Sequence, residues 1–251
     1  MRIALIGRGR VATHLLKALL QAGHEVVSVN SRTLEELPLE ADVYILSVKD
    51  SALQDVIHNA VKGREGQLFV HTAGSMSMDL FKGCCARDGV LYPMQTFSLD
   101  REVNFREIPL FIEASDAATF QQIRALADSV SQHVYELSTA DRRYLHLAAV
   151  FACNFTNHCY ALAADVLAQK GLPFDVMLPL IDETARKVHE LHPTDAQTGP
   201  AVRGDQNVMD AQSALLDDRL ATIYMLMSES IKDEKERYDQ LRLKEDTGHR
   251  V

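Results

Sequence analysis

Residues 1–12 read MRIALIGRGRVA, and this stretch decides the fold. The first six residues are a short, mostly apolar run, which is typical of a parallel strand buried on both faces. The glycines that follow give the pattern G-x-G-x-x-A from Gly7 to Ala12, where a helix pattern begins. A second strand pattern lies at residues 25–29. The start of the chain therefore predicts a strand–helix–strand unit with a glycine-rich turn.

The same rhythm of strands and helices continues to residue 139. Further strand patterns lie at residues 42–48, 67–71, 90–92, 109–113 and 133–136, and helix patterns lie at residues 11–22, 52–61 and 116–131. Strands that alternate with helices in this way predict an α/β fold. We expect a doubly wound parallel sheet of the Rossmann type over residues 1–139.

No strand pattern appears in residues 140–251. Helix patterns cover residues 141–169, 173–191, 205–217 and 218–241. We therefore expect an all-helical C-terminal domain, in which residues 141–169 form one long, regular helix.

The glycine loop predicts a site for the pyrophosphate of a dinucleotide. Gly7 permits the tight turn, and Gly9 lets the backbone approach the phosphates. Val11 opens the helix, whose free amides and positive dipole end attract an anion. Arg8 and Arg10 lie between these positions, and we expect them to face phosphate oxygens.

The residues after the second strand predict which dinucleotide binds. A site that prefers NAD has Asp or Glu there, to accept a hydrogen bond from the ribose 2′-hydroxyl. This chain has Asn30, Ser31 and Arg32 instead. No carboxylate repels a 2′-phosphate, and a hydroxyl and a guanidinium can bind one. The sequence therefore predicts NADP(H), although Arg32 as an ordinary solvated loop residue stays open.

Two further segments follow strands of the expected sheet. They are Ser47, Val48 and Lys49 after the third strand, and Thr72, Ala73 and Gly74 after the fourth. Because the carboxyl ends of parallel strands face the ligand crevice, we expect both segments to contact the cofactor near its nicotinamide ring. Ordinary turn chemistry is the alternative.

Several segments together resemble one known family. They are RIALIGRGRVA, SVKDSAL, HTAGS, YPMQTFS at residues 92–98, HLAAVFACNFTNH at residues 146–158 and TGPAVRGD at residues 198–205. The chain resembles Rossmann-like proteins with a C-terminal domain of unknown function (DUF2520), which are described as NADP oxidoreductases. Their superfamily includes pyrroline-5-carboxylate reductase, 6-phosphogluconate dehydrogenase and F420-dependent NADP reductases. The resemblance implies NADP as cofactor, a Rossmann domain followed by a helical domain, and no settled substrate.

The candidate catalytic residues lie in the expected helical domain. On a regular helix, His146, Val150, Cys153 and Asn157 would fall within about 40° of one line, with Asn154 beside them. Polar side chains on such a face are typical of a site at a domain cleft. Histidine suits a proton donor because its ordinary pKa is near 6.5. A buried histidine bonded to a nearby carbonyl is the alternative.

Arg203 is the candidate anion-binding residue. It lies in the turn at residues 198–205, where its planar guanidinium could bind a carboxylate or phosphate of the substrate. An ion pair with Asp205 that only fixes the turn is the alternative. The related β-hydroxyacid dehydrogenases use a lysine on the long helix, and no lysine precedes Lys170 there, so their mechanism does not carry over directly.

Composition limits the partners. The net charge of −9 argues against a broad basic face for nucleic acid or anionic lipid. No apolar run approaches the ~20 residues of a membrane-spanning helix, and we expect neither a secretory signal nor a metal site. We expect a cytoplasmic protein that forms a homodimer through its helical domain.

Three functions fit these patterns. The leading one is an NADP(H)-dependent oxidoreductase that reduces a small, anionic oxo or imine metabolite. The second is a module that binds and senses NADP(H) without turnover. The third is an F420-linked NADP reductase.

Overall fold

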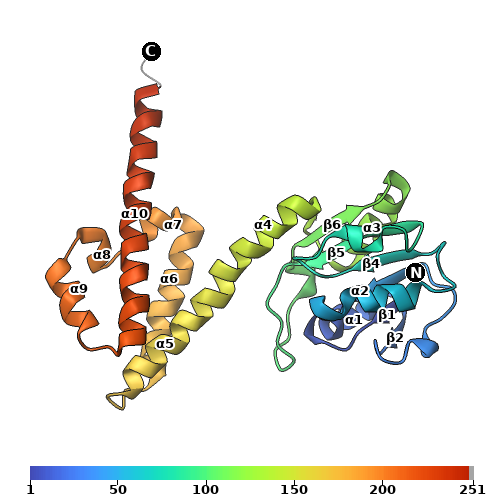
Figure 1. Ribbon diagram of the computed structural model, residues 1–251, viewed down its shortest axis with the longest axis horizontal. Coiled ribbons are helices and arrows are strands. Elements are labelled where there is room, and N and C mark those ends of the chain that lie inside the picture. Colours follow the sequence, from blue (N-terminus) through green and yellow to red (C-terminus); the bar gives the residue numbers. More distant parts are fainter. Residues whose placement is uncertain (249–251) are drawn as a thin grey trace. The chain divides into compact units, whose positions relative to one another are not determined.

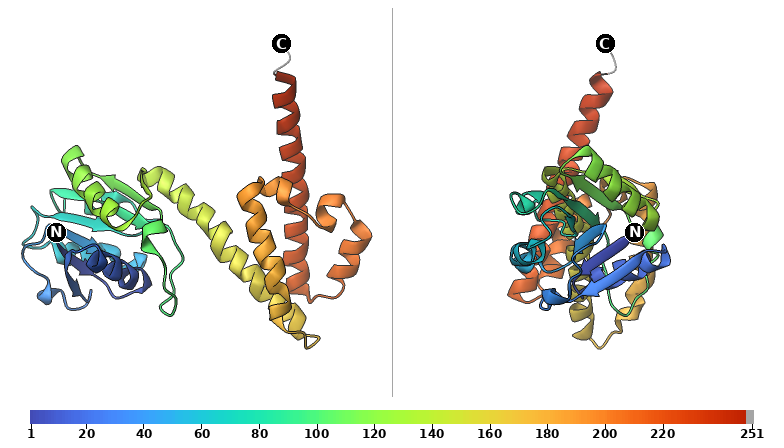
Figure 2. Two further views of the ribbon diagram at one scale, coloured as in Figure 1. Left: turned by 180° about the vertical axis from the view of Figure 1, so that it is seen from behind. Right: turned by 90° about the vertical axis from the view of Figure 1, so that its right-hand side faces the viewer.

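The computed structural model describes the backbone of residues 1–248 and the side chains of residues 1–244. The chain divides into two compact units, Met1–Asn154 and Phe155–Val251 (Figure 1, Figure 2).

The first unit is built on a seven-stranded sheet with the order β2-β1-β3-β4-β5-β6-β7. The strands are β1 (Arg2–Ile6), β2 (Glu25–Val29), β3 (Val43–Leu46), β4 (Leu68–His71), β5 (Arg87–Pro93), β6 (Leu110–Ala114) and β7 (Val134–Glu136). The five strands from β1 to β5 pair in parallel, so their carboxyl ends lie along one edge of the sheet. The predicted α/β fold is confirmed.

Alternation along the strands divides the core between the two faces of the sheet. Leu5 and the other strand residues that point to the same face of the sheet pack against α1 (Arg10–Gln21) and α3 (Ala117–Val130). Ile6 and the other strand residues that point the opposite way pack against α2 (Asp50–Val61) on the other face. Helices on both faces explain why these strands are apolar throughout rather than alternating with polar residues.

The sheet differs from the expected parallel arrangement at one strand pair. β6 runs antiparallel to β5, with Leu91 opposite Ile112, while β7 is again parallel to β6. The connection between β5 and β6 contains only a short 3₁₀ turn, Phe105–Glu107, and not the crossover helix that returns a chain to a parallel strand.

The segment predicted as one regular helix, residues 141–169, contains an interruption. Helix α4 (Thr139–Ala149) ends in a π-helical segment, Val150–Phe155, and α5 (Thr156–Ala168) follows. A π-helix has i→i+5 hydrogen bonds and more residues in each turn than an α-helix. The prediction that His146, Val150, Cys153 and Asn157 follow one line is therefore wrong, because that line assumes an uninterrupted α-helical period.

The second unit is helical, as predicted. It holds α5, α6 (Leu178–Glu190), α7 (Pro193–Ala196), α8 (Pro200–Arg203), α9 (Gln206–Ser213) and α10 (Asp218–Gly248). α10 contacts α7, α8 and α9. Helix α4 belongs to the first unit, which extends to Asn154, and Thr139 and Arg142 of this helix bond to Glu113 of β6.

Candidate functional site

A cavity of about 890 Å³ lies in the first unit, at the carboxyl ends of β1, β3 and β4. Its wall contains most of the residues that the sequence predicts for a cofactor. These are Gly7, Arg8, Gly9, Arg10, Val11, Ser31, Arg32, Ser47, Val48, Lys49, Thr72, Ala73 and Gly74, and the candidate catalytic residue His146 also lines it. Residues far apart in the sequence therefore meet in one cavity.

The glycine loop leaves room above the first turn of α1. Gly7 has a φ of +132°, and a Cβ atom there would collide with the backbone carbonyl of Ser47. Gly9 is the N-cap of α1, and a Cβ atom there would meet nothing within 4 Å. None of the described side chains caps this helix, so its first amides remain available to an anion. This arrangement fits the pyrophosphate of a dinucleotide.

The loop after β2 presents Ser31 and Arg32 to the cavity but not Asn30. The Asn30 side-chain oxygen instead accepts a hydrogen bond from the backbone amide of Arg32 at 3.0 Å. Asn30 therefore shapes the loop that carries the other two side chains.

Four basic side chains line the cavity and are exposed: Arg8, Arg10, Arg32 and Lys49. Within residues 1–244, none of the four forms an ion pair. Asp50 and Asp55 line the same cavity, so its wall has a small excess of positive charge. Such a wall suits a ligand with several negative charges.

The loops after β3 and β4 are bonded to each other below the cavity. The Thr72 hydroxyl donates to the Ser47 hydroxyl at 3.1 Å, and both side chains are buried. The backbone amide of Ala73 donates to Nδ1 of His71 at 3.2 Å. Burial, together with the nearby positive charge of Arg142, lowers the pKa of His71 to about 4, so this imidazole is neutral at neutral pH.

His146 reaches the cavity from α4. Its Nδ1 atom lies 3.1 Å from the hydroxyl of Tyr92, and Tyr92 also lines the cavity. Sequence reasoning missed Tyr92 as a site residue, although the rule that selected the ends of β3 and β4 applies equally to the end of β5. Burial raises the pKa of the Tyr92 hydroxyl, so it stays protonated at neutral pH.

A second cavity of about 540 Å³ adjoins the first. Its wall is mostly apolar, with Phe97 from the loop after β5, Leu145 from α4 and Val150 from the π-helical segment. Asn154, a candidate from the sequence, lies in this wall.

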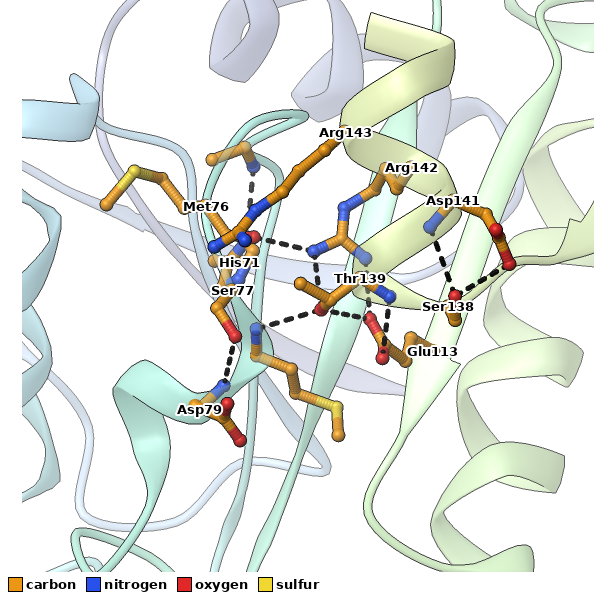
Figure 3. Close-up of polar contacts among 12 residues, drawn as sticks. His71, Met76, Ser77, Asp79, Glu113, Ser138, Thr139, Asp141, Arg142 and Arg143 are labelled. Carbon is orange, nitrogen blue, oxygen red and sulfur yellow. Dashed lines mark hydrogen bonds and ion pairs between the residues drawn. The ribbon is translucent and has the colours of Figure 1, made fainter.

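A buried arginine fixes α4 to the sheet. Arg142 is fully buried, and its Nη1 atom forms an ion pair with Glu113 of β6 at 2.6 Å (Figure 3). Its Nη2 atom donates to the carbonyl of Met76, in the loop after β4, at 2.6 Å. The hydroxyl of Thr139 donates to Glu113 at 2.7 Å. These contacts connect the first turn of α4 both to β6 and to the loop that carries Gly74.

The charge state of Glu113 follows from the same contacts. Burial opposes ionisation, but hydrogen bonds from Thr139 and the Arg142 guanidinium outweigh it and hold the pKa of Glu113 below its ordinary value. The carboxylate is therefore ionised at neutral pH and balances the buried guanidinium.

Two predicted site residues lie in the second unit. Asn157 is an exposed residue of α5. Arg203 is exposed at the end of α8, and its Nη2 atom lies 2.7 Å from the carboxylate of Asp205. Asp205 precedes α9, but its side chain makes no capping bond to that helix. The ion pair between Arg203 and Asp205, which the sequence offered as the alternative role of Arg203, is thus present.

In the part of the chain that the structure describes, no three His, Cys, Asp or Glu side chains are grouped to hold a metal ion. No helix of that part is apolar over the length needed to cross a bilayer.

Comparisons with known proteins identify related families. The family described as "Domain of unknown function (DUF2520)" matches residues 108–231, and the family described as "NADP oxidoreductase coenzyme F420-dependent" matches residues 2–39. A crystal structure from Bacteroides fragilis, of a protein assigned as an NADP oxidoreductase, shares 47% sequence identity with this chain. The match covers 92% of this chain and 98% of that one, with a TM-score of 0.87.

More distant structures share the fold. The imine reductase of Myxococcus stipitatus in complex with NADP+ has 17% identity and a TM-score of 0.66, over 94% of this chain and 95% of that chain. The Plasmodium falciparum pyrroline carboxylate reductase with NADP bound has 12% identity and a TM-score of 0.60, over 94% and 97%. Among curated proteins, no sequence matches this chain. The identity and coverage of the Bacteroides relative mean that the chain belongs to the family of Rossmann-fold proteins that carry a DUF2520 domain.

Proposed function

We propose that this protein is an NADP(H)-dependent oxidoreductase that reduces the C=O or C=N group of a small metabolite. The observation that carries the proposal is the 890 Å³ cavity, where an uncapped helix N-terminus faces open space above Gly9. Ser31 and Arg32 line the same cavity, without the carboxylate that would bind a ribose 2′-hydroxyl. The NADP-bound imine and pyrroline carboxylate reductases with this fold support the proposal.

In this proposal, the glycine loop and the first turn of α1 hold the pyrophosphate, and Ser31 and Arg32 hold the 2′-phosphate. The loops that end in Lys49 and Gly74 contact the nicotinamide half. The bound cofactor supplies the hydride. His146, from α4, supplies the proton that the reduced oxygen or nitrogen requires.

The cofactor assignment is tested by calorimetric titration with NADPH and NADH. Replacing Arg32 by Ala removes a charged hydrogen bond, so NADPH binding should weaken by roughly 1.5–3 kcal/mol, with little change for NADH. Arg101→Ala is the matched control, because Arg101 is exposed and does not line the cavity. Tighter binding of NADH than of NADPH by the unmodified protein would refute the assignment.

Turnover is tested with a panel of keto acids and cyclic imines, following the loss of NADPH absorbance. Reduction of a panel member supports an oxidoreductase. Binding of NADPH without reduction of any member would favour a sensing module instead.

We also propose that Arg203 binds an anionic group of the substrate. Arg203→Lys keeps the charge but loses the planar guanidinium, so it should raise KM more than it lowers kcat. If the exchange changes neither constant, Arg203 only pairs with Asp205.

A homodimer through the helical unit is the last part of the proposal. Among the described residues of that unit, only Ala201, Met209, Leu220 and Ser228 are buried. Large apolar side chains such as Leu180 and Leu215 are 62% and 76% exposed. A second copy of the chain would cover such surfaces. Light scattering should give twice the 28.0 kDa mass of one chain, and a monomer at micromolar concentration would contradict the proposal.

A further inference from the structure

Five residues line both cavities of the first unit: Arg10, Val11, Tyr92, Gln95 and His146. Two of them are hydrogen-bonded to each other, through the Tyr92 hydroxyl and Nδ1 of His146 at 3.1 Å. Their rings meet edge to face, with centroids 5.9 Å apart and planes at 71°. The pair therefore stands where the cofactor cavity opens into the mostly apolar one.

The surrounding backbone closes one side of this hydrogen bond. A Cβ atom at Gly74 would lie 2.6 Å from Nδ1 of His146 and 2.8 Å from Cζ of Tyr92. Gly74 thus packs directly against both partners, and Tyr92 is only 8% exposed. Nδ1 is engaged and covered, whereas Nε2 of His146 makes no hydrogen bond within residues 1–244. Nε2 is therefore the ring nitrogen that remains free to exchange a proton with a ligand.

α4 is anchored so that His146 stays in this place. Arg142 lies four residues before His146, hence on the same face of the helix. Its bonds to Glu113 and to the Met76 carbonyl fix this face against β6 and against the loop of Gly74 (Figure 3).

Resting on the proposed reductase function, we propose that Tyr92 and His146 form a proton-delivery pair. Tyr92 is the positioning residue, which accepts a hydrogen bond from Nδ1–H of His146. Nε2–H of the imidazolium is the group that protonates the substrate. The substrate is a carbonyl or imine compound, and its reacting atom lies at the junction of the two cavities.

The C=O or C=N carbon gains the hydride that the bound cofactor supplies, and the π electrons of the double bond move to oxygen or nitrogen. That atom takes the proton from Nε2, which forms the alcohol or amine. His146 becomes a neutral imidazole that keeps its proton on Nδ1, and solvent returns a proton to Nε2. The Tyr92 hydroxyl accepts from Nδ1–H before and after transfer, so the ring holds its orientation throughout.

The raised pKa of Tyr92 agrees with this division of roles. A phenol that resists ionisation is a poor source of the proton itself but a stable acceptor for a neighbouring N–H.

The pair is tested first by NMR on the full-length protein with NADP+ added. Long-range ¹H–¹⁵N correlations report which nitrogen of neutral His146 carries the proton. In the unmodified protein we expect Nδ1–H. Tyr92→Phe removes only the acceptor, so the proton should redistribute to the mixture of tautomers found in free histidine. Tyr135→Phe, at an exposed tyrosine of β7, is the control.

The second measurement is reduction of the cyclic imine 2-methyl-1-pyrroline. Tyr92→Phe should lower kcat by about 10-fold, since it removes one hydrogen bond to a charged group. His146→Ala should lower kcat by ~10²–10⁴-fold, the usual share of general acid catalysis. Neither exchange should change the Kd for NADPH by more than about 2-fold, because the glycine loop and Arg32 are untouched.

The possible failures are distinct. A tautomer that is the same in the unmodified protein and in Tyr92→Phe overturns the pair, whatever the activity. An altered tautomer with unchanged kcat overturns its role in proton delivery. Binding of NADPH by the unmodified protein without reduction of any carbonyl or imine probe overturns the proposed function, and the proton delivery with it.

Discussion

Two glycines of the loop after β1 lack side chains for different reasons. At Gly7 the fold itself excludes a side chain, because φ is +132° and the Ser47 carbonyl occupies the Cβ position. At Gly9 the backbone has an ordinary extended conformation, with φ of −77° and ψ of 179°, and the Cβ position is open. Open space at a helix N-terminus is where a phosphate approaches the backbone.

These two positions separate folding from binding. Gly9→Ala should leave the melting temperature within about 2 °C of the unmodified protein and weaken NADPH binding at least about 10-fold, since its methyl group occupies the phosphate space. Gly7→Ala should unfold at a clearly lower temperature, because backbone strain adds to the collision with Ser47. Thermal melts and calorimetric titration check both. Equal affinity of Gly9→Ala and the unmodified protein would show that no phosphate lies there.

His71 makes folding sensitive to pH. Its pKa is 6.5 in the unfolded chain and about 4 in the folded protein. As the pH falls from 6.5 to 4, His71 takes up a proton in the unfolded state but stays largely neutral in the folded state. The stability due to neutral His71 is therefore complete above pH 6.5 and is lost through this window, by roughly 3 kcal/mol in all.

The measurement compares the unmodified protein with His71→Asn, whose side-chain oxygen can still accept from the amide of Ala73. Urea unfolding at each pH gives the free energy of unfolding of the unmodified protein minus that of His71→Asn. This difference should fall by roughly 3 kcal/mol when the pH is lowered from 7 to 4. The two proteins must be compared because Asp88, whose pKa burial raises to about 6, makes both of them more stable as the pH falls. Subtracting one protein from the other removes this contribution. A difference that is constant with pH contradicts the prediction.

At the scale of elements, one buried ion pair helps to hold α4 on the sheet, beside the hydrogen bond from Thr139 to Glu113. Arg142 is nearly inaccessible, while the Glu113 side chain is 19% exposed. Losing one partner of such a pair leaves the other charge uncompensated.

Arg142→Met should therefore lower the free energy of unfolding by about 3–5 kcal/mol. Arg143→Met, an exposed neighbour with one long hydrogen bond to the Ser75 carbonyl, should change it by less than about 0.5 kcal/mol. Urea denaturation measures both. A double variant, Arg142→Met with Glu113→Gln, should recover part of the loss, and no recovery would argue against a charge effect.

Sequence patterns located nearly every strand and helix of the first unit because its sheet is covered on both faces. Buried apolar runs such as residues 43–46 stand out clearly against the polar turns. The direction of β6 could not be predicted, since Leu110–Ala114 has the same apolar character whichever way it runs. The π-helical segment was missed because the extra residue in its turn leaves no compositional mark. Tyr92 ends the strand pattern at residues 90–92, but it was missed because cofactor contacts were expected only after the third and fourth strands.

At the scale of the whole molecule, the two units differ in how much core each contains. The first has an apolar core on each face of its sheet, and both candidate cavities lie within it. The second buries four of its described residues. Burial of apolar surface is the main favourable term in folding, so the units should differ in independent stability.

A fragment of residues 1–154 should therefore unfold cooperatively and bind NADPH within about 10-fold of the full chain, because it carries the whole cofactor cavity. A fragment of residues 155–251 should show no cooperative transition as a monomer. Circular dichroism during urea titration checks both fragments. If the first fragment fails to bind NADPH although it is folded, the second unit contributes directly to the cofactor site.

The four exposed cations that line the cofactor cavity belong to a molecule whose net charge is −9. At physiological ionic strength the Debye length is about 8 Å, so an approaching dinucleotide senses these side chains only in the last few ångströms. NADPH and NADH should therefore be captured at similar speeds, and the extra phosphate should act after arrival. The 2′-phosphate should therefore lengthen the residence time of NADPH, since related ligands differ mainly in their dissociation rates. In stopped-flow fluorescence, NADPH and NADH should have similar association rate constants, and NADPH should have the smaller dissociation rate constant.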